Sequence, residues 1–401
     1  MPMSPARKLW CRTYQAAFRI VLPILPYYEP KRLDSTARIP GLLTSKNIAS
    51  VLVVTDPGVY KLGLTRPLED ALANAGIAWA VYAKTVANPT ISNVEEAAGL
   101  YRERGCQAIV GFGGGSAMDC AKGVGARIAQ PRKPIQKMRG LLRVHRRLPL
   151  LIAVPTTAGT GSETTLAAVI TDEATHYKYP INDFALIPRY AVLDPELTLG
   201  LPAQVTATTG MDALTHAVEA YVGRSTNAYT RRMAVDAVRL IHGNLLSAYR
   251  NGGELDARRA MLEAAYKAGC AFTRSYVGYV HAIAHSLGGQ YGTPHGLANA
   301  VILPHVLRAY GSAAERRLAD LARKSGVVDP SESDADAAAG FIRWVDSMNA
   351  SMGIPSALEG IRDEDIPTMA AHADAEANSL YPVPVLWDAD ELAAMYRKIR
   401  A

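Results

Sequence analysis

The chain has 401 residues, 49% of them hydrophobic and 20% charged, and a formal net charge of +6 at pH 7, which is the composition of a soluble globular protein long enough for two domains. No apolar run approaches the about eighteen residues that span a bilayer, which excludes a membrane-spanning chain and predicts no membrane partner. The four cysteines have no CxxC spacing, which excludes a thiolate zinc site and a disulfide framework and predicts a reducing, cytoplasmic location.

The first 28 residues are basic and contain no acid, and the stretch 20–28 is mostly apolar. A secretory signal needs an uninterrupted apolar core, which Arg19, Pro23 and Pro26 break. A transit peptide and an interfacial amphipathic helix are the alternatives. We expect a leading helix that packs on the N-terminal domain.

Apolar runs and helical segments alternate over the next part of the chain. Strands are expected over 51–56, 78–82, 108–112, 150–154 and 167–171, with a further strand ending at Val192. Helices are expected over 60–74, 93–104 and 113–128. Strand alternating with helix predicts a parallel, Rossmann-like sheet with helices on its faces.

A glycine-rich turn, Gly113-Gly-Gly-Ser-Ala-Met-Asp119, follows the third of these strands and opens a helix. Glycines let a phosphate approach the backbone, and the free amides at a helix start bind an anion. Ser116 stands where the dinucleotide fingerprint has its third glycine, so the standard pattern is not met. A plain strand-to-helix connection is the alternative, but the alternating context favours phosphate binding, with Gly113 as the first candidate residue.

A second loop, Pro155-Thr-Thr-Ala-Gly-Thr-Gly-Ser-Glu163, follows the strand over 150–154. Ligands of parallel sheets bind at the carboxyl ends of strands, so we expect the two loops to flank one cofactor. A polar Ω-loop alone would not explain two such loops on neighbouring strands. The candidate cofactor-binding hydroxyls here belong to Thr156, Thr157, Thr160 and Ser162.

The stretch from Cys120 to Ser162 has nine basic residues and no acid. No aromatic residue interleaves these charges and no nucleic-acid motif accompanies them, so we expect no nucleic-acid partner. A solvated surface that also attracts an anionic cofactor is the better interpretation.

Strands end near Pro202, and Ala-rich helical periodicity takes over beyond it. We therefore expect an α/β dinucleotide-binding domain over residues 1–202 and an all-α metal-binding domain over residues 203–401. No internal repeat of solenoid length is apparent.

The helical half contains closely spaced metal-ligand candidates. His281 and His285 are four residues apart in an apolar helical context, and so project from one helix face. Asp212 and His216 form a second such pair, and His295 lies in a Pro-His-Gly turn. A lone helical histidine is usually a packed or surface residue, but two pairs and a turn favour a metal site. One carboxylate and several imidazoles without a thiolate suit Fe²⁺ or Zn²⁺.

These motifs resemble the iron-containing (group III) alcohol dehydrogenase family. The resemblance runs from Val51 onwards and depends on the two glycine-rich loops, on Gly210-Met-Asp-Ala-Leu-Thr-His-Ala-Val-Glu219, and on the stretch from His281 to Gly296. It implies the dehydroquinate synthase-like architecture. It also implies an NAD(P)- and metal-dependent alcohol dehydrogenase or aldehyde reductase, acting on a small alcohol or aldehyde as a homodimer.

The resemblance also implies a role for individual residues. Asp56 matches the acidic residue that accepts from the adenosine ribose, and a carboxylate there favours NAD over NADP because it repels a 2′-phosphate. His285 corresponds to a histidine near the substrate and nicotinamide, which makes it our candidate catalytic proton relay. The implied metal ligands are Asp212, His216, His281 and His295. The implied cofactor contacts are Gly114, Gly115, Ser116 and Asp119 at the pyrophosphate, Thr156, Thr157 and Thr160 along the cofactor, and Lys178 near its ribose.

Three other functions are alternatives. A hydroxyacid-oxoacid transhydrogenase of the same fold would keep its nicotinamide bound while exchanging two substrates. A metal-dependent lyase of the dehydroquinate synthase type would need a basic cluster beside the histidines, which the helical half does not offer. A metal-stabilised binding protein would not explain two cofactor loops together with a metal site.

Overall fold

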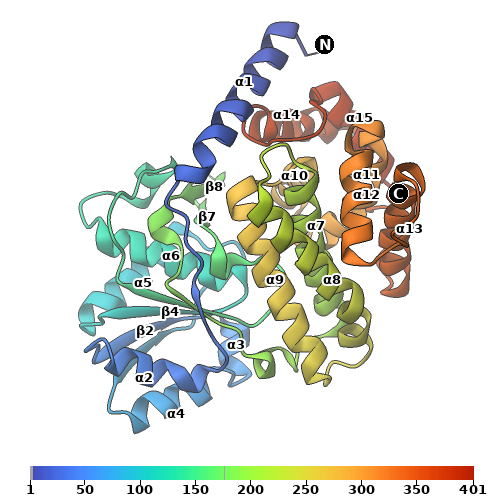
Figure 1. Ribbon diagram of the computed structural model, residues 1–401. Helices are drawn as coiled ribbons and strands as arrows, with labels where there is room; N and C mark the ends of the chain where they lie inside the picture. The colour runs from blue at the N-terminus through green and yellow to red at the C-terminus, as the bar shows by residue number, and fades with distance from the viewer. Residues whose placement is uncertain (1–2, 176) are drawn as a thin grey trace. The chain divides into compact units, whose positions relative to one another are not determined.

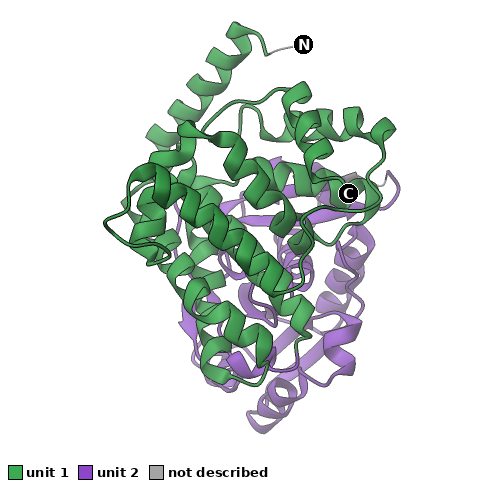
Figure 2. Cartoon of the chain, turned by 90° about the vertical axis from the view of Figure 1, so that its right-hand side faces the viewer, with its two compact units in different colours: residues 1–25, 201–401 green, residues 26–200 purple. Residues whose placement is uncertain are grey.

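The computed structural model describes residues 3–175 and 177–401 (Figure 1). The chain forms two compact units (Figure 2). One is the α/β unit, Pro26–Gly200, and the other is the helical unit, Leu201–Ala401 together with the N-terminal residues up to Leu25.

The α/β unit is built on a six-stranded parallel sheet, which confirms the predicted fold class. Its order is β1 (Lys31–Leu33), β9 (Tyr190–Val192), β6 (Leu150–Pro155), β4 (Ala108–Gly113), β2 (Ser50–Val54) and β3 (Ala78–Tyr82). Every residue of β4 is buried. A strand covered on both faces needs a nearly continuous apolar run, and this is the pattern from which the strand was predicted.

Helices cover both faces of this sheet (Figure 1). They are α2 (Ile39–Thr44), α3 (Pro57–Lys61), α4 (Arg66–Asn74), α5 (Ile91–Glu103) and α6 (Gly115–Ala129). One core packs α5 and α6 against Ile109 of β4, and the other packs α2 and α4 against Val110. Successive side chains of the strand thus enter opposite cores.

The single helix expected over 60–74 is two helices, so that expectation is wrong. Gly63, between α3 and α4, has φ of +72°, a left-handed conformation that ends a helix. Proline in the first turn of α4 then favours a new helix start.

A second, three-stranded sheet has the order β5 (Gly140–Leu141), β8 (Tyr177–Asn182) and β7 (Ala167–Asp172). β7 and β8 are antiparallel. Short 3₁₀ helices occur at Leu22–Ile24, Thr36–Arg38, Ile135–Met138, Ser162–Thr164, Phe184–Leu186, Pro195–Thr198 and Asp363–Asp365.

The helical unit surrounds α7, which is buried along most of its length and packs against α8, α9, α11 and α12. Its helices are α1 (Pro5–Val21), α7 (Ala203–Val222), α8 (Ala228–Arg250), α9 (Leu255–Ser275), α10 (Tyr279–Tyr291), α11 (His295–Tyr310), α12 (Ser312–Ser325), α13 (Asp334–Ser351), α14 (Ile366–Ala377) and α15 (Ala389–Ile399). The C-terminal part is mostly helical, which confirms the helical half of the predicted architecture. Among the described residues, no helix has the length and apolarity needed to cross a bilayer.

The leading helix α1 belongs to the helical unit, and this differs from the expected domain over residues 1–202. The Arg12 guanidinium donates to the carbonyl of Val383 at 2.8 Å, and the Gln15 amide donates to that of Tyr381 at 2.7 Å. Arg7 pairs with Asp374 at 2.8 Å. These partners lie more than 360 residues away, so helical periodicity in α1 could not identify them. The division into a dinucleotide-binding domain and a metal-binding domain stays a prediction.

Candidate active site

Four side chains that the sequence singles out as metal ligands converge in the helical unit. Asp212 and His216 come from one face of α7, His281 from the first turn of α10, and His295 is the first residue of α11. The Oδ1 atom of Asp212 lies 3.7, 3.8 and 3.4 Å from the Nε2 atoms of His216, His281 and His295, respectively. The ligand atoms of Asp212, His216 and His281 all lie within 4.8 Å of one another.

These separations fit a bound divalent metal. Two ligand atoms that are each about 2.1 Å from a tetrahedral metal lie about 3.4 Å apart. The donor set of one carboxylate and three imidazoles suits Fe²⁺ or Zn²⁺. Nδ1 of His216 and Oδ1 of Asn299 are buried with no partner among the described residues, so hydrogen bonds do not fully satisfy this polar cluster. The ligation itself stays a prediction.

Close packing of α11 on α7 brings His295 to this cluster. A Cβ atom on Gly296 would lie only 2.4 Å from the backbone oxygen of Thr208. Only glycine therefore lets the first turn of α11 approach α7 so closely. This explains the glycine in the Pro-His-Gly turn.

The charges in the cluster shift the pKa values of its members. Burial alone would raise the pKa of Asp212, but the nearby imidazoles of His295 and His216 hold it below its usual range. Burial lowers the pKa of His216 well below its usual value. Burial would also lower the pKa of His281, yet the Glu219 and Asp212 carboxylates outweigh it and raise this pKa to about 9. A cation at Nε2 would replace that proton, because both neutralise the same carboxylates.

Glu219, which the sequence reasoning missed, orients His281. Its carboxylate contacts Nδ1 of His281 at 2.6 Å and accepts from the backbone N–H groups of Gly278 at 2.7 Å and Val280 at 2.8 Å. This hydrogen bond places the proton of the imidazole on Nδ1 and leaves Nε2 toward Asp212. The sequence could have indicated Glu219, because it follows Asp212 by two helical turns and lies on the same helix face.

Asn299 is a second missed residue. Its Nδ2 atom lies 2.7 Å from Oδ1 of Asp212, 3.1 Å from Nε2 of His295 and 3.3 Å from Nε2 of His281. It is fully buried and follows His295 by one helical turn, a spacing that would have identified it. Asn299 thus ties the carboxylate to two of the histidines.

His285 lies beside the cluster with a different partner. Its Nδ1 is 2.6 Å from Oε1 of Glu376, which also accepts from the Tyr381 hydroxyl at 2.6 Å. Burial would raise the pKa of Glu376, but His285 outweighs it and lowers this pKa. The His285 ring stacks on that of His295 with centroids 5.2 Å apart. The structure thus gives His285 and His281 different carboxylate partners, although they share a helix face.

In the α/β unit, the two glycine-rich loops lie side by side. Gly113 pairs with Pro155 at the ends of β4 and β6, and the N–H of Thr156 donates to the carbonyl of Gly113 at 3.0 Å. Gly114 is the N-cap of α6. A Cβ on Gly115 would lie 3.0 Å from the Thr160 side chain, and one on Gly114 would lie 3.6 Å from Oγ1 of Thr157. The contact at Gly115 is tighter than a side chain normally allows, so this glycine lets the second loop approach the start of α6.

Asp119 and Ser162, both predicted to contact the cofactor, are joined within the protein. The Ser162 hydroxyl donates to Asp119 at 2.8 Å, and the other oxygen of Asp119 accepts from the N–H of Val169 at 3.1 Å. Lys122 donates to Ser162 at 2.9 Å and to Thr165 at 2.7 Å. These bonds fix the second loop to α6.

Lys122 corrects the prediction of a solvated basic surface, which is wrong at this position. The residue is completely buried, and burial lowers its pKa to about 8. Its ammonium also donates to the backbone oxygen of Ala167 at 2.8 Å. Sequence spacing did not predict the burial of Lys122, because its hydrogen-bond partners Ser162, Thr165 and Ala167 lie on another segment of the chain.

The remaining predicted cofactor residues lie near the same loops. Asp56 caps α3 by accepting from the N–H groups of Gly58 and Val59 at 2.9 and 3.0 Å, and its Oδ2 is 3.2 Å from the Cβ position of Gly113. Lys178 donates to Asn88 Oδ1 at 2.7 Å, and the Asn88 N–H donates to the Ser116 hydroxyl at 3.3 Å. Their contacts with a cofactor stay predictions.

Glu163 in the second loop makes stability depend on pH. Burial raises its pKa to about 7 from an ordinary value of 4.5, and among the described residues Oε2 has no partner. The folded state therefore binds this proton more tightly than the unfolded state, so stability falls as the pH rises from about 4.5 to 7.

We expect Glu163→Gln to remove this dependence, since the amide does not titrate. At pH 8 the variant should be more stable than the wild type, by about 2 kcal/mol of unfolding free energy, and at pH 5 the two should be nearly equal. Thermal unfolding midpoints between pH 5 and pH 8 measure the effect. Glu103→Gln, on the exposed end of α5, is the control. Parallel pH profiles of wild type and Glu163→Gln would contradict the expectation.

Comparison with known proteins gives consistent matches along the chain. The family description "Iron-containing alcohol dehydrogenase" matches residues 32–195, and "Fe-containing alcohol dehydrogenase family, C-terminal" matches residues 206–400. The chain is 38% identical over 385 residues to a 1,3-propanediol dehydrogenase of Klebsiella pneumoniae, which covers 95% of this chain and 98% of that protein. It is 39% identical over 324 residues to an NAD-dependent methanol dehydrogenase of Bacillus methanolicus, which covers 80% of this chain and 85% of that protein. A crystal structure of a 1,3-propanediol oxidoreductase superimposes with a TM-score of 0.89 at 37% identity, covering 93% and 99% of the two chains.

Proposed function

Because the chain belongs to the iron-containing alcohol dehydrogenase family, we propose that it transfers a hydride reversibly between a small alcohol and NAD at a site that holds Fe²⁺. It is an alcohol or aldehyde oxidoreductase. The single observation that supports the iron site best is the approach of one carboxylate oxygen to three imidazole nitrogens within 3.4–3.8 Å.

The residues that would hold the metal are Asp212, His216, His281 and His295. When bound, the metal supplies a Lewis acid that polarises the substrate oxygen. Glu219 keeps the His281 ring in the required tautomer, and Asn299 holds the Asp212 carboxylate through the 2.7 Å bond to its Oδ1. Zn²⁺ suits the same nitrogen and oxygen atoms, while the family match supports iron.

The two glycine-rich loops support a nicotinamide dinucleotide as the second part of the proposal. Backbone N–H groups at the start of α6 and the positive end of its dipole attract a pyrophosphate. Asp56 lies against Gly113 at the end of β4, and a carboxylate there favours NAD because it repels a 2′-phosphate. The NAD-dependent methanol dehydrogenase among the relatives agrees with this preference.

His285 is proposed as the proton relay. Glu376 occupies its Nδ1 atom at 2.6 Å, which leaves Nε2 free to accept or donate a proton. The side chain is 36% exposed, so it can exchange that proton with solvent. A relay between the substrate hydroxyl and water is the role that this arrangement suits.

Replacing His285 with alanine should lower kcat about 100-fold while metal content stays at the wild-type level. Steady-state rates and elemental analysis of the same preparation measure the two effects. His372→Ala, an exposed histidine on α14, is the control and should change neither. If His285→Ala loses its metal, His285 is a ligand and the relay role is wrong.

The experiment that tests the whole proposal is NADH formation with a panel of small alcohols, before and after metal removal and on adding back Fe²⁺ or Zn²⁺. Activity that needs the metal and free NAD supports the proposal. Exchange between a hydroxyacid and an oxoacid without free NAD would favour the transhydrogenase instead.

The proposal also includes a cytoplasmic location and a homodimer. None of the four buried cysteines forms a disulfide within the described structure, which agrees with a reducing compartment, and light scattering tests the dimer.

A further inference from the structure

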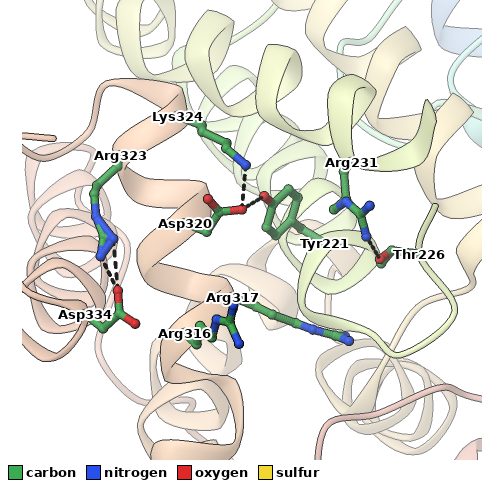
Figure 3. A pocket seen from close by; sticks show the side chains of 9 residues that line it. All are labelled: Tyr221, Thr226, Arg231, Arg316, Arg317, Asp320, Arg323, Lys324 and Asp334. Atoms are coloured by element: carbon green, nitrogen blue, oxygen red, sulfur yellow. Dashed lines mark hydrogen bonds and ion pairs between the residues drawn. The ribbon is translucent and has the colours of Figure 1, made fainter. Parts of the chain in front are cut away.

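A cavity of about 580 Å³ lies in the helical unit and shares no lining residue with the metal cluster (Figure 3). Its walls come from α7, α8, α12 and α13, and from the turn after α7. A second cavity of about 410 Å³ shares Tyr221, Arg231 and Lys324 with it. We call the larger cavity the arginine pocket, because its lining includes Arg231, Arg316, Arg317 and Arg323.

The acids of the arginine pocket are already paired. Asp320 accepts from the Tyr221 hydroxyl and from Lys324, the latter at 2.8 Å. Asp334 accepts from Arg323 at 2.9 Å. Figure 3 shows both acids turned toward these partners. Each negative charge in the lining is therefore offset by a neighbouring cation.

Three guanidinium groups are left without an acid among the described residues. Arg231 makes one hydrogen bond, to the Thr226 hydroxyl at 3.1 Å. Arg317 donates to the backbone oxygens of Val222, at 2.9 Å, and Gly223. Arg316 is exposed and has no hydrogen bond or ion pair within the described part of the chain. The lining thus carries three positive charges that no carboxylate offsets.

Further positive charges lie near Arg317. Burial lowers the pKa of its guanidinium, and the positive charges of Arg224, Arg19 and Arg231 lower it further. Like charges held together in this way raise the free energy of the folded protein. A bound anion would offset that repulsion.

We propose that the arginine pocket binds an anion with two phosphate groups close together, such as diphosphate or the diphosphate of a nucleotide. Guanidinium groups form paired hydrogen bonds with phosphate oxygens. Two phosphate groups carry about three negative charges near neutral pH, which matches the three uncompensated arginines. The volume lies within the range of small-molecule sites. None of the residues proposed for the dehydrogenase reaction takes part, so this site is independent of that function.

Isothermal titration of the full chain with diphosphate tests the proposal. Saturating NAD is present throughout, so that the glycine-rich loop at the start of α6 does not bind the probe. We expect one diphosphate per chain in the wild type and at least about tenfold weaker binding in the double variant Arg231→Gln, Arg316→Gln, since each loses a charge-assisted hydrogen bond. Arg250→Gln removes one positive charge at the other end of α8 and should bind as the wild type does.

Measurements of folding and of basal activity serve as controls for the double variant. The double variant removes two charges that repel their neighbours, so its thermal midpoint should not fall, and alcohol oxidation should be unchanged. Arg317 is left intact because it binds the backbone at the end of α7. Unchanged diphosphate affinity in the double variant, or the same loss in Arg250→Gln, would overturn the proposal. Equal competition by sulfate at matched ionic strength would also overturn it, because the pocket would then be only a region of positive potential.

A phospholipid headgroup is another source of the same chemistry. Sedimentation with phosphatidylcholine vesicles that contain a bisphosphorylated phosphoinositide separates the two sources. Binding to vesicles that the double variant loses would support the phosphate site and assign its ligand to a lipid. Diphosphate binding without sedimentation would support the site and assign its ligand to a soluble metabolite.

Discussion

Replacing Asp212 with asparagine should reduce the bound metal to a trace and lower kcat/KM by about 1000-fold or more. The asparagine has the same shape, so the helix packing around it remains, but it lacks the negative charge that faces three imidazoles. In the wild type, Oδ1 of Asp212 is the atom that approaches the Nε2 atoms of all three histidines within 3.4–3.8 Å. Neutral ligands alone offset the charge of a divalent cation poorly. Elemental analysis and steady-state kinetics on one preparation measure both effects.

The control for this variant is Asp346→Asn. Asp346 lies on α13 and pairs with Arg308 at the surface, so its loss should leave the metal and the rate unchanged. Added Fe²⁺ should restore the activity of the Asp212→Asn variant only at concentrations far above those that saturate the wild type. Full metal content with normal activity in Asp212→Asn would refute the assignment of the site.

Replacing Glu219 with alanine should have the second largest effect, on both stability and metal binding. The change leaves the N–H groups of Gly278 and Val280 and the Nδ1–H of His281 buried without their acceptor. Unsatisfied donors of this kind cost about 1–3 kcal/mol each before relaxation, so the unfolding free energy should fall by at least about 2 kcal/mol. Metal affinity should fall about 10- to 100-fold, because His281 loses the bond that orients it.

Glu219→Gln distinguishes charge from packing at this position. The amide keeps the volume and one acceptor, but its NH₂ group faces a donor, so it should recover part of the stability and little of the metal affinity. Competition with a metal chelator measures the affinity, and thermal unfolding of the metal-free protein measures the stability. A metal affinity of Glu219→Ala equal to that of the wild type would show that His281 needs no orienting partner.

The elements of the α/β unit followed from local pattern. Buried parallel strands need nearly continuous apolar runs, and helices between them need a periodic apolar face, so both are visible within a short window of sequence. The short elements β1, α2 and β5, and strand β8, were not predicted, and the stretch 60–74 was predicted wrongly. There Gly63 takes a positive φ and divides the helix, a detail that apolar periodicity does not report.

Spacing predicted part of the proposed metal site. Pairs four residues apart share a helix face whatever surrounds the helix, which is why Asp212 with His216, and His281 with His285, were identified. Spacing could not separate the roles of His281 and His285, since both offer the same imidazole on the same face. The resemblance supplied that distinction. In the structure, Glu219 binds the first and Glu376 the second.

The sequence by itself determined the parallel sheet, the two glycine-rich loops and the donor types of the proposed metal site, because each is encoded in residues close together along the chain. Only the tertiary structure decided that α1 belongs to the helical unit, that Lys122 is buried, and that three arginines of one pocket lack a carboxylate. These features depend on groups that are distant in sequence, such as Arg12 and Val383, 371 residues apart. Helix packing decides which of these distant groups meet. Helix packing minimises the free energy of the whole unit rather than of any local segment.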